Sequence, residues 1–132
     1  MTQDIPNPDE HEWNFEKRGK VGIWYLDGWQ GFSDEELATI TEHYRERGKK
    51  DDIKATLAVF GDETSLSQET QEYMGEEWSK NGEYVDVDRI GFVSDGIVGM
   101  AVKSNMTITG TKVENFKNVE EAVEWSKEGI EN

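Results

Sequence analysis

The alternation of apolar and polar positions predicts a β-hairpin near the start of the chain. Trp13 and Phe15 alternate with polar residues, as in a strand with one solvated face, and residues 17–20 supply a turn. Residues 21–26 are apolar on both faces, which is typical of an inner strand covered by helices on each side of the sheet. The residues before the hairpin, 1–12, carry both prolines and predict a flexible leader.

Three further short segments predict strands. The first two, residues 55–60 and 89–93, are almost entirely apolar and are therefore expected to be buried. The third, residues 112–116, is expected to join the same sheet as a parallel strand after a helical connection. The chain thus alternates strand and helix after its opening hairpin.

A first helix is expected to begin at Ser33. Ser33 and Glu36 fit a capping box, and Phe32 with Leu37 occupies the two positions of a hydrophobic staple. Apolar residues then recur at helical spacing, and Gly48 is the expected stop.

A second helix is expected to run from Ser65 or Ser67 to Lys80, with Asn81-Gly82 as its end. Gly75 within it is expected to weaken the helix by about 1 kcal/mol relative to alanine. The imperfect apolar stripe of this helix consists of Leu66, Tyr73, Met74, Glu77 and Trp78.

Residues 96–106 fit two structures. Ser94-Asp95-Gly96 is able to turn a hairpin, whereas Asp95 is also able to cap a short helix. Local propensity favours the hairpin, but the alternation of strands and helices favours the helix, which we predict. A last helix is expected to begin after Asn118 as its cap.

These elements predict an α/β fold class. We expect a small two-layer or sandwich domain over residues 13–132, with a mixed, mostly parallel sheet of about five strands and four helices. A chain of 132 residues is long enough for one such domain and too short for two independent cores.

Composition narrows the classes of function. The chain has no cysteine, which excludes disulfides, thiolate zinc sites and cysteine nucleophiles. Its net charge of −15 repels phosphate backbones, so no nucleic-acid partner is expected. The apolar runs are too short for a membrane span and the start lacks the features of a signal peptide, so we expect a cytoplasmic protein.

The acidic excess extends along the whole chain and resembles that of proteins from salt-loving archaea. Molar salt shortens the Debye length to about 3 Å and removes most of the self-repulsion that this charge causes. The excess is steepest between residues 61 and 88, where nine acidic residues face only Lys80. Two interpretations remain open: a docking face for a basic partner, or the solvated face of a helix.

The last third of the chain carries packing motifs that resemble a known family. Arg89-Ile90-Gly91-Phe92-Val93, a strand that ends in Phe116, and Glu121-Ala122-Val123-Glu124-Trp125 are similar to the closing elements of domains related to bacterial anti-sigma-factor antagonists. These are the STAS-like or SpoIIAA-like domains, in which a small alanine stands at the position of Gly91 and a leucine at that of Ser126. The resemblance covers residues 13–130 and implies a regulatory protein-interaction module.

The phosphorylatable members of that family carry a serine in a D-S-[ST]-G segment before a helix. The matching residues 61–67 lack this pattern, but three hydroxyl residues there are candidate phosphoacceptors. Helix capping is the alternative role for these hydroxyls. The candidates are Thr64, Ser65 and Ser67.

Two groups of residues are candidates for chemistry or binding. Asp27, Asp62 and Asp95 each follow a predicted parallel strand, so they are expected at one edge of the sheet. Three carboxylates there suit a magnesium or calcium ion. The alternative is that each aspartate only forms a turn or a helix cap. Trp29 and Phe32 lie in a loop at the same edge and, with Tyr73, are candidates for contact with an apolar ligand or a partner.

Neither histidine has a second potential metal ligand at a suitable spacing. His11 and His43 are therefore expected to be exposed, and no cofactor is expected. The first functional hypothesis is a non-enzymatic cytoplasmic interaction module adapted to high salt, with a protein partner. The alternatives are a carrier or sensor of a small apolar ligand or lipid, and a divalent-metal-dependent enzyme. The oligomeric state stays open.

Overall fold

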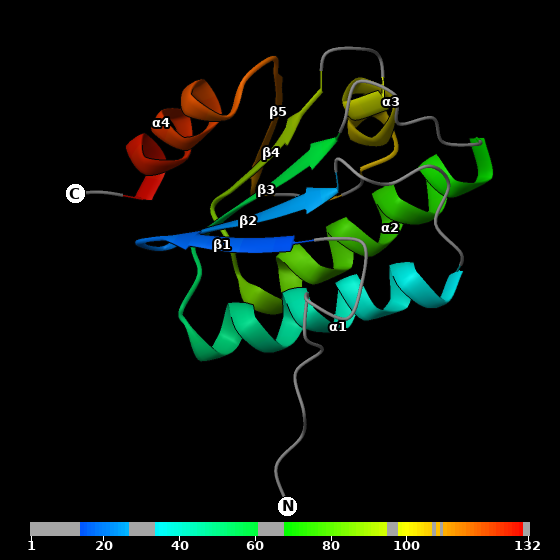
Figure 1. Ribbon diagram of the computed structural model, residues 1–132, viewed down its shortest axis with the longest axis horizontal. Coiled ribbons are helices and arrows are strands. Elements are labelled where there is room, and N and C mark those ends of the chain that lie inside the picture. The colour runs from blue at the N-terminus through cyan, green and yellow to red at the C-terminus, as the bar shows by residue number, and fades with distance from the viewer. Residues whose placement is uncertain are drawn as a thin grey trace, which may run out of the picture.

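The computed structural model describes residues 14–26, 34–60, 68–94, 98–106, 108 and 110–130. This part of the chain contains a five-stranded sheet and four helices, which confirms the predicted fold class (Figure 1). The elements are β1 (Asn14–Arg18), β2 (Val21–Leu26), α1 (Asp34–Lys50), β3 (Ala55–Phe60), α2 (Gln68–Val85), β4 (Arg89–Val93), α3 (Val98–Ser104), β5 (Lys112–Phe116) and α4 (Val119–Ile130). The choice of a helix within residues 96–106 is therefore correct.

The strands lie in the sheet in the same order as in the sequence. β1 and β2 form the predicted antiparallel hairpin, and β2, β3, β4 and β5 are parallel neighbours. The hairpin turns at Gly19 and Lys20, and Gly19 has a φ of +63°, which is why glycine is favoured at this position of a two-residue turn.

Because every crossover moves to the next strand in one direction, α1, α2 and α3 all cover the same face of the sheet, and α4 covers the other (Figure 1). The larger core lies under the three helices and includes the fully buried Trp24, Tyr44 and Trp78. The smaller core lies under α4 and includes Leu57 and Ala122.

The first helix ends near Gly48, as predicted, but Gly48 itself does not stop it, and the predicted end of the second helix is wrong. α1 continues past Gly48 to Lys50, and α2 continues past Asn81-Gly82 to Val85. A Cβ atom at Gly48 would lie 2.6 Å from Val85 Cγ2, so this glycine allows the two helices to approach closely. The glycine is required by packing between helices and not by a helix stop.

Both helices end instead at an aspartate in the left-handed conformation. Asp52 has a φ of 53° and Asp86 a φ of 69°. After α1 the Ile53 N–H donates to the Gly48 carbonyl at 2.9 Å, and after α2 the Val87 N–H donates to the Gly82 carbonyl at 3.1 Å. This is the hydrogen bond that closes a helix when the residue beyond its end is left-handed, a position usually held by glycine.

Gly75 has a packing role as well. A Cβ atom at Gly75 would lie 2.6 Å from Asn105 Cβ, just after α3, so the glycine allows α2 and α3 to pack. At the other end of the chain, the Asn118 side chain accepts a hydrogen bond from the Glu121 N–H at 2.9 Å, as predicted for a helix cap.

Candidate functional site

Tyr73 is the one predicted site residue that lies within the described residues. The candidate metal ligands Asp27, Asp62 and Asp95, the loop residues Trp29 and Phe32, and the candidate phosphoacceptors Thr64, Ser65 and Ser67 all lie outside them. The predictions for these eight residues therefore stay predictions.

The strands that lead to the three aspartates are adjacent, as expected. Leu26 at the end of β2 pairs with Phe60 at the end of β3, and Val59 pairs with Val93 at the end of β4. Among the residues that the structure describes, no group of three or more histidine, cysteine or acidic side chains is arranged to hold a metal ion.

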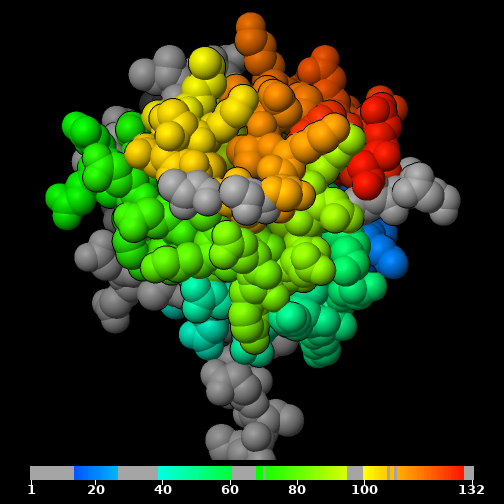
Figure 2. Space-filling model, turned by 180° about the vertical axis from the view of Figure 1, so that it is seen from behind, coloured from blue at the N-terminus to red at the C-terminus, as the bar shows by residue number. Residues whose placement is uncertain are grey.

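A groove of about 620 Å³ lies between α1 and α2. The two helices cover the sheet side by side and, as connections between parallel strands, run in the same direction (Figure 1). Figure 2 shows α2, in green, running across this side of the molecule, with α3, in yellow, above it and part of α1, in teal, below it. The groove is lined by Thr41, Glu42, Arg45, Glu46, Tyr73, Glu77 and Tyr84.

Helical spacing explains why these side chains meet. Thr41 and Arg45 lie one turn apart on α1, and Glu77 and Asn81 lie one turn apart on α2. Arg45 Nε donates a hydrogen bond to Asn81 Oδ1 at 2.6 Å, and Arg45 Nη2 lies 3.8 Å from Glu77 Oε1. The close approach at Gly48 fixes the helices just beyond this pair.

Three side chains at the helix interface contain buried polar atoms that have no hydrogen-bond partner in the described structure: Thr41 Oγ1, Trp78 Nε1 and Asn81 Nδ2. Thr41 is only 6% exposed although it lines the groove, and Trp78 and Asn81 are fully buried. A buried polar group without a partner costs about 1–3 kcal/mol, so such groups call for a functional explanation.

Carboxylates outnumber cations along the groove. Glu42, Glu46 and Glu77 face a single arginine, Arg45. The Glu77 side chain is 18% exposed, and its second carboxylate oxygen lies 3.6 Å from Lys80 Nζ. Among the lining residues, three carboxylates therefore stand against one arginine, and Glu77 is shared between Arg45 and Lys80.

Two exposed tyrosines flank the groove from α2. Tyr73 is 36% exposed and Tyr84 is 53% exposed, and Lys49 Nζ lies 4.8 Å from the centre of the Tyr84 ring. Next to them, four exposed glutamates recur along one side of α2 and form what we call the acidic ridge. The acidic ridge consists of Glu69, Glu72, Glu76 and Glu83.

The expected exposure of His43 is wrong, because this side chain is 2% exposed. Its Nδ1 accepts a hydrogen bond from Trp24 Nε1 at 2.9 Å, and the Phe15 ring lies 4.8 Å away. Burial, with the nearby positive charge of Arg47, lowers the pKa of His43 from 6.5 to about 4. The contact with β1 is long-range in sequence, so helix periodicity alone did not reveal it.

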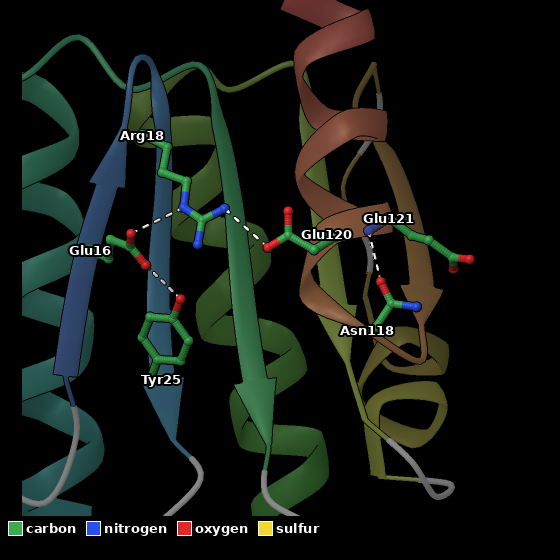
Figure 3. Close-up of polar contacts among 6 residues, drawn as sticks. All are labelled: Glu16, Arg18, Tyr25, Asn118, Glu120 and Glu121. Atoms are coloured by element: carbon green, nitrogen blue, oxygen red, sulfur yellow. Dashed lines mark hydrogen bonds and ion pairs between the residues drawn. The ribbon is translucent and has the colours of Figure 1, made fainter.

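A second polar cluster lies on the opposite face of the sheet, between β1, β2 and α4 (Figure 3). Glu16 accepts hydrogen bonds from Tyr25 Oη at 2.6 Å and from Arg18 Nε at 3.0 Å, and Arg18 Nη1 reaches Glu120 at 3.4 Å. The Tyr25 and Arg18 bonds lower the pKa of Glu16, while burial and Glu16 raise the pKa of Tyr25 to about 12.

Comparison with known proteins does not identify this arrangement. No family model, no curated protein and no solved structure matches the chain. None of the helices in the described part of the chain has the length and apolar character that crossing a membrane requires.

Proposed function

We propose that the chain is a non-enzymatic, cytoplasmic protein-interaction module that binds a basic segment of a partner protein on the surface formed by α1 and α2. One observation carries this proposal: two exposed tyrosines flank a groove whose carboxylates outnumber its single arginine. Tyrosine is enriched in protein interfaces because its ring supplies apolar area and its hydroxyl supplies hydrogen bonding.

The acidic ridge supports the same choice of partner. Its four glutamates lie next to the tyrosines, and Lys80 is the one basic residue of α2. An acidic surface steers a basic partner and repels acidic ones. At molar salt the Debye length is about 3 Å, so the carboxylates then act at contact distance and the tyrosines supply a larger share of the binding.

The resemblance to STAS-like domains supports an interaction role from the sequence side, because those domains act by binding other proteins. The polar lining of the groove supports a peptide over the alternative of a small apolar ligand. Two of the seven lining residues are tyrosines, and the other five are four charged residues and one threonine. The metal-dependent alternative depends on Asp27, Asp62 and Asp95, which lie outside the described residues.

The test is a pull-down from the host at its native salt concentration, with mass spectrometry of captured proteins and of extracted small molecules. The wild type is expected to retain a stoichiometric partner that the double variant Tyr73→Ala/Tyr84→Ala loses by about tenfold or more. Met100→Ala is the matched control, because Met100 is also exposed but lies on α3. A lipid or metabolite captured without protein would instead favour the carrier.

A charge-matched pair of variants separates local from overall electrostatics. Glu72→Gln/Glu76→Gln removes two charges from the acidic ridge, and Glu121→Gln/Glu124→Gln removes two exposed charges from α4. We expect the ridge variant alone to weaken capture of the partner. Equal loss in both variants would mean that the net charge, and not this surface, attracts the partner.

We also propose that the acidic surface adapts the chain to high salt. Self-repulsion at a net charge of −15 is expected to unfold the protein below about 0.5 M salt, with recovery in molar potassium chloride. Circular dichroism along a salt titration measures this directly. Stability that does not change with salt would contradict the adaptation while leaving the interaction surface in place.

A further inference from the structure

We infer, on the basis of the proposed function, that the floor of the α1–α2 groove binds an acceptor oxygen of the docked segment, either a backbone carbonyl or a C-terminal carboxylate. Thr41 and Arg45, which line the groove, are the hydrogen-bond donors of this site, and the buried Asn81 holds Arg45 in position. The site lies among the carboxylates that line the groove and is distinct from the acidic ridge.

The first argument is the combination of burial and missing partners. Thr41 lines the groove and is only 6% exposed, and its buried hydroxyl has no hydrogen-bond partner in the described structure. Asn81 Nδ2 is fully buried without a partner, although the other amide atom, Oδ1, is held by Arg45. Buried polar groups are nearly always paired in native proteins, and Thr41 is the unpaired one that lines the groove, so its hydroxyl has a hydrogen bond to offer to an atom that enters there.

The second argument is that the Arg45 guanidinium is held in place on one side while other N–H groups make no hydrogen bond to Glu77. Its Nε is fixed on Asn81 at 2.6 Å, but Nη2 lies 3.8 Å from Glu77, which is too long for a hydrogen bond. The guanidinium is therefore positioned and still has donors to offer. A fixed arginine fork is the group best suited to bind a carbonyl or carboxylate oxygen.

The third argument concerns the chemical class of the ligand that contains the acceptor oxygen. The guanidinium of Arg45 is a donor only, so it selects an acceptor atom. Glu42, Glu46 and Glu77 surround these donors and repel an isolated anion. The acceptor must therefore belong to a ligand that also brings positive charge, and a basic peptide satisfies both requirements: its carbonyls reach the floor while its cationic side chains meet the rim.

The experiment is a titration followed by ¹H–¹⁵N correlation NMR, in salt at which the protein is folded. The probes are two short peptides in which lysine alternates with alanine and leucine, both N-acetylated, one with a C-terminal amide and one with a free carboxylate. The side-chain N–H signals of Arg45, Asn81 and Trp78 report on the floor, and the backbone signals of Tyr73 and Tyr84 report on the rim.

We expect both sets of signals to shift. Equal affinity of the two peptides identifies a backbone carbonyl as the ligand atom, whereas tighter binding of the free carboxylate identifies the C-terminus. Thr41→Val keeps the shape of the side chain and is expected to raise the Kd about fivefold. Thr111→Val is the matched control, because the Thr111 hydroxyl already donates to the Val87 carbonyl and lies away from the groove.

The outcomes separate the two proposals. Shifts at Tyr73 and Tyr84 with unchanged Arg45 and Asn81 signals, or an unchanged Kd in Thr41→Val, would overturn the acceptor site and leave the interaction surface standing; the unpaired groups would then hold water only. No shift at either set of signals would overturn both the acceptor site and the basic partner.

Discussion

The two polar clusters on opposite faces of the sheet differ in how their hydrogen bonds are satisfied. Near α4, each of the four side chains Glu16, Arg18, Tyr25 and Glu120 bonds to another member of the cluster (Figure 3). Between α1 and α2, Thr41 and Asn81 keep buried atoms without partners in the described structure. The first cluster is complete and joins β1 to α4, whereas the second retains hydrogen-bonding capacity for a ligand.

The same contrast holds for the aromatic residues of the two faces. On the α4 face, Trp125 packs against Phe116 with ring centres 5.2 Å apart, and the Arg89 guanidinium lies 4.8 Å from the Trp125 ring. On the other face, Tyr73 and Tyr84 extend beside the groove and are exposed. Aromatic area near α4 contributes to folding, and aromatic area at the groove is available for association.

The largest expected effect on stability is that of Trp125→Ala. Loss of the ring removes its packing on Phe116 and the stacked Arg89, which is expected to cost about 3–5 kcal/mol. Denaturant unfolding in molar potassium chloride measures this change, with Glu124→Ala at an exposed neighbouring position as control. Partner binding by the folded variant is expected to stay unchanged, and a near-neutral effect on stability would mean that α4 does not dock through Trp125.

The next largest effect is a dependence of folding stability on pH that is caused by the buried His43. The pKa of His43 is lowered from 6.5 to about 4, so the unfolded chain binds the proton first as the pH falls. Stability from this group is present above pH 6.5 and is lost between about pH 6.5 and 4, by about 2–3 kcal/mol. Denaturant midpoints across this range measure it, and His43→Gln, which keeps an acceptor for Trp24, is expected to remove this part of the slope. An unchanged slope in the variant would contradict the burial of a neutral histidine.

A smaller loss of stability is expected when one hydrogen bond is removed from the polar cluster near α4. Tyr25→Phe removes the hydrogen bond to Glu16 and is expected to lower the free energy of unfolding by about 0.5–1.5 kcal/mol. Because Tyr25 and Glu16 lie across the sheet from the groove, peptide affinity is expected to stay the same. A loss of peptide affinity in Tyr25→Phe would contradict the assignment of a structural role to the cluster near α4 and a binding role to the groove.

The smallest effect on stability has the opposite sign. Thr41→Val replaces a buried hydroxyl that has no partner, so the free energy of unfolding is expected to stay constant or to rise by up to about 1 kcal/mol. Thermal unfolding alongside Thr111→Val, which removes a made hydrogen bond, measures this difference. Destabilisation of Thr41→Val as large as that of the control would show that the Thr41 hydroxyl has a structural role.

The order and type of the elements were predictable because periodicity is a local property of the sequence. The residues that end the helices were not, since Gly48 is needed for contact with Val85, which is distant in sequence, and aspartates hold the left-handed positions usually held by glycine. The burial of His43 likewise depends on β1, through Phe15.

Of the groove, the sequence predicted Tyr73 as a candidate contact, and it offered the acidic residues between 61 and 88, which include Glu77, as a docking face for a basic partner. The pairing of Arg45 with Asn81 connects two helices and leaves no local pattern. One signal was present: Met74, Trp78 and Val85 define a buried stripe at helical spacing, and Asn81 is a polar residue within it. A polar residue on a core-facing stripe indicates either a buried hydrogen-bond network or a binding site.

Site-specific photo-crosslinking in the host tests the central claim most directly. A photoreactive amino acid replaces Tyr73 in one variant and Met100 in another, and mass spectrometry identifies the crosslinked segment of the partner. We predict that the Tyr73 position captures one protein through a lysine- or arginine-rich segment and that the Met100 position does not. Capture of an acidic or apolar segment, or equal capture from both positions, would contradict a basic partner docked between α1 and α2.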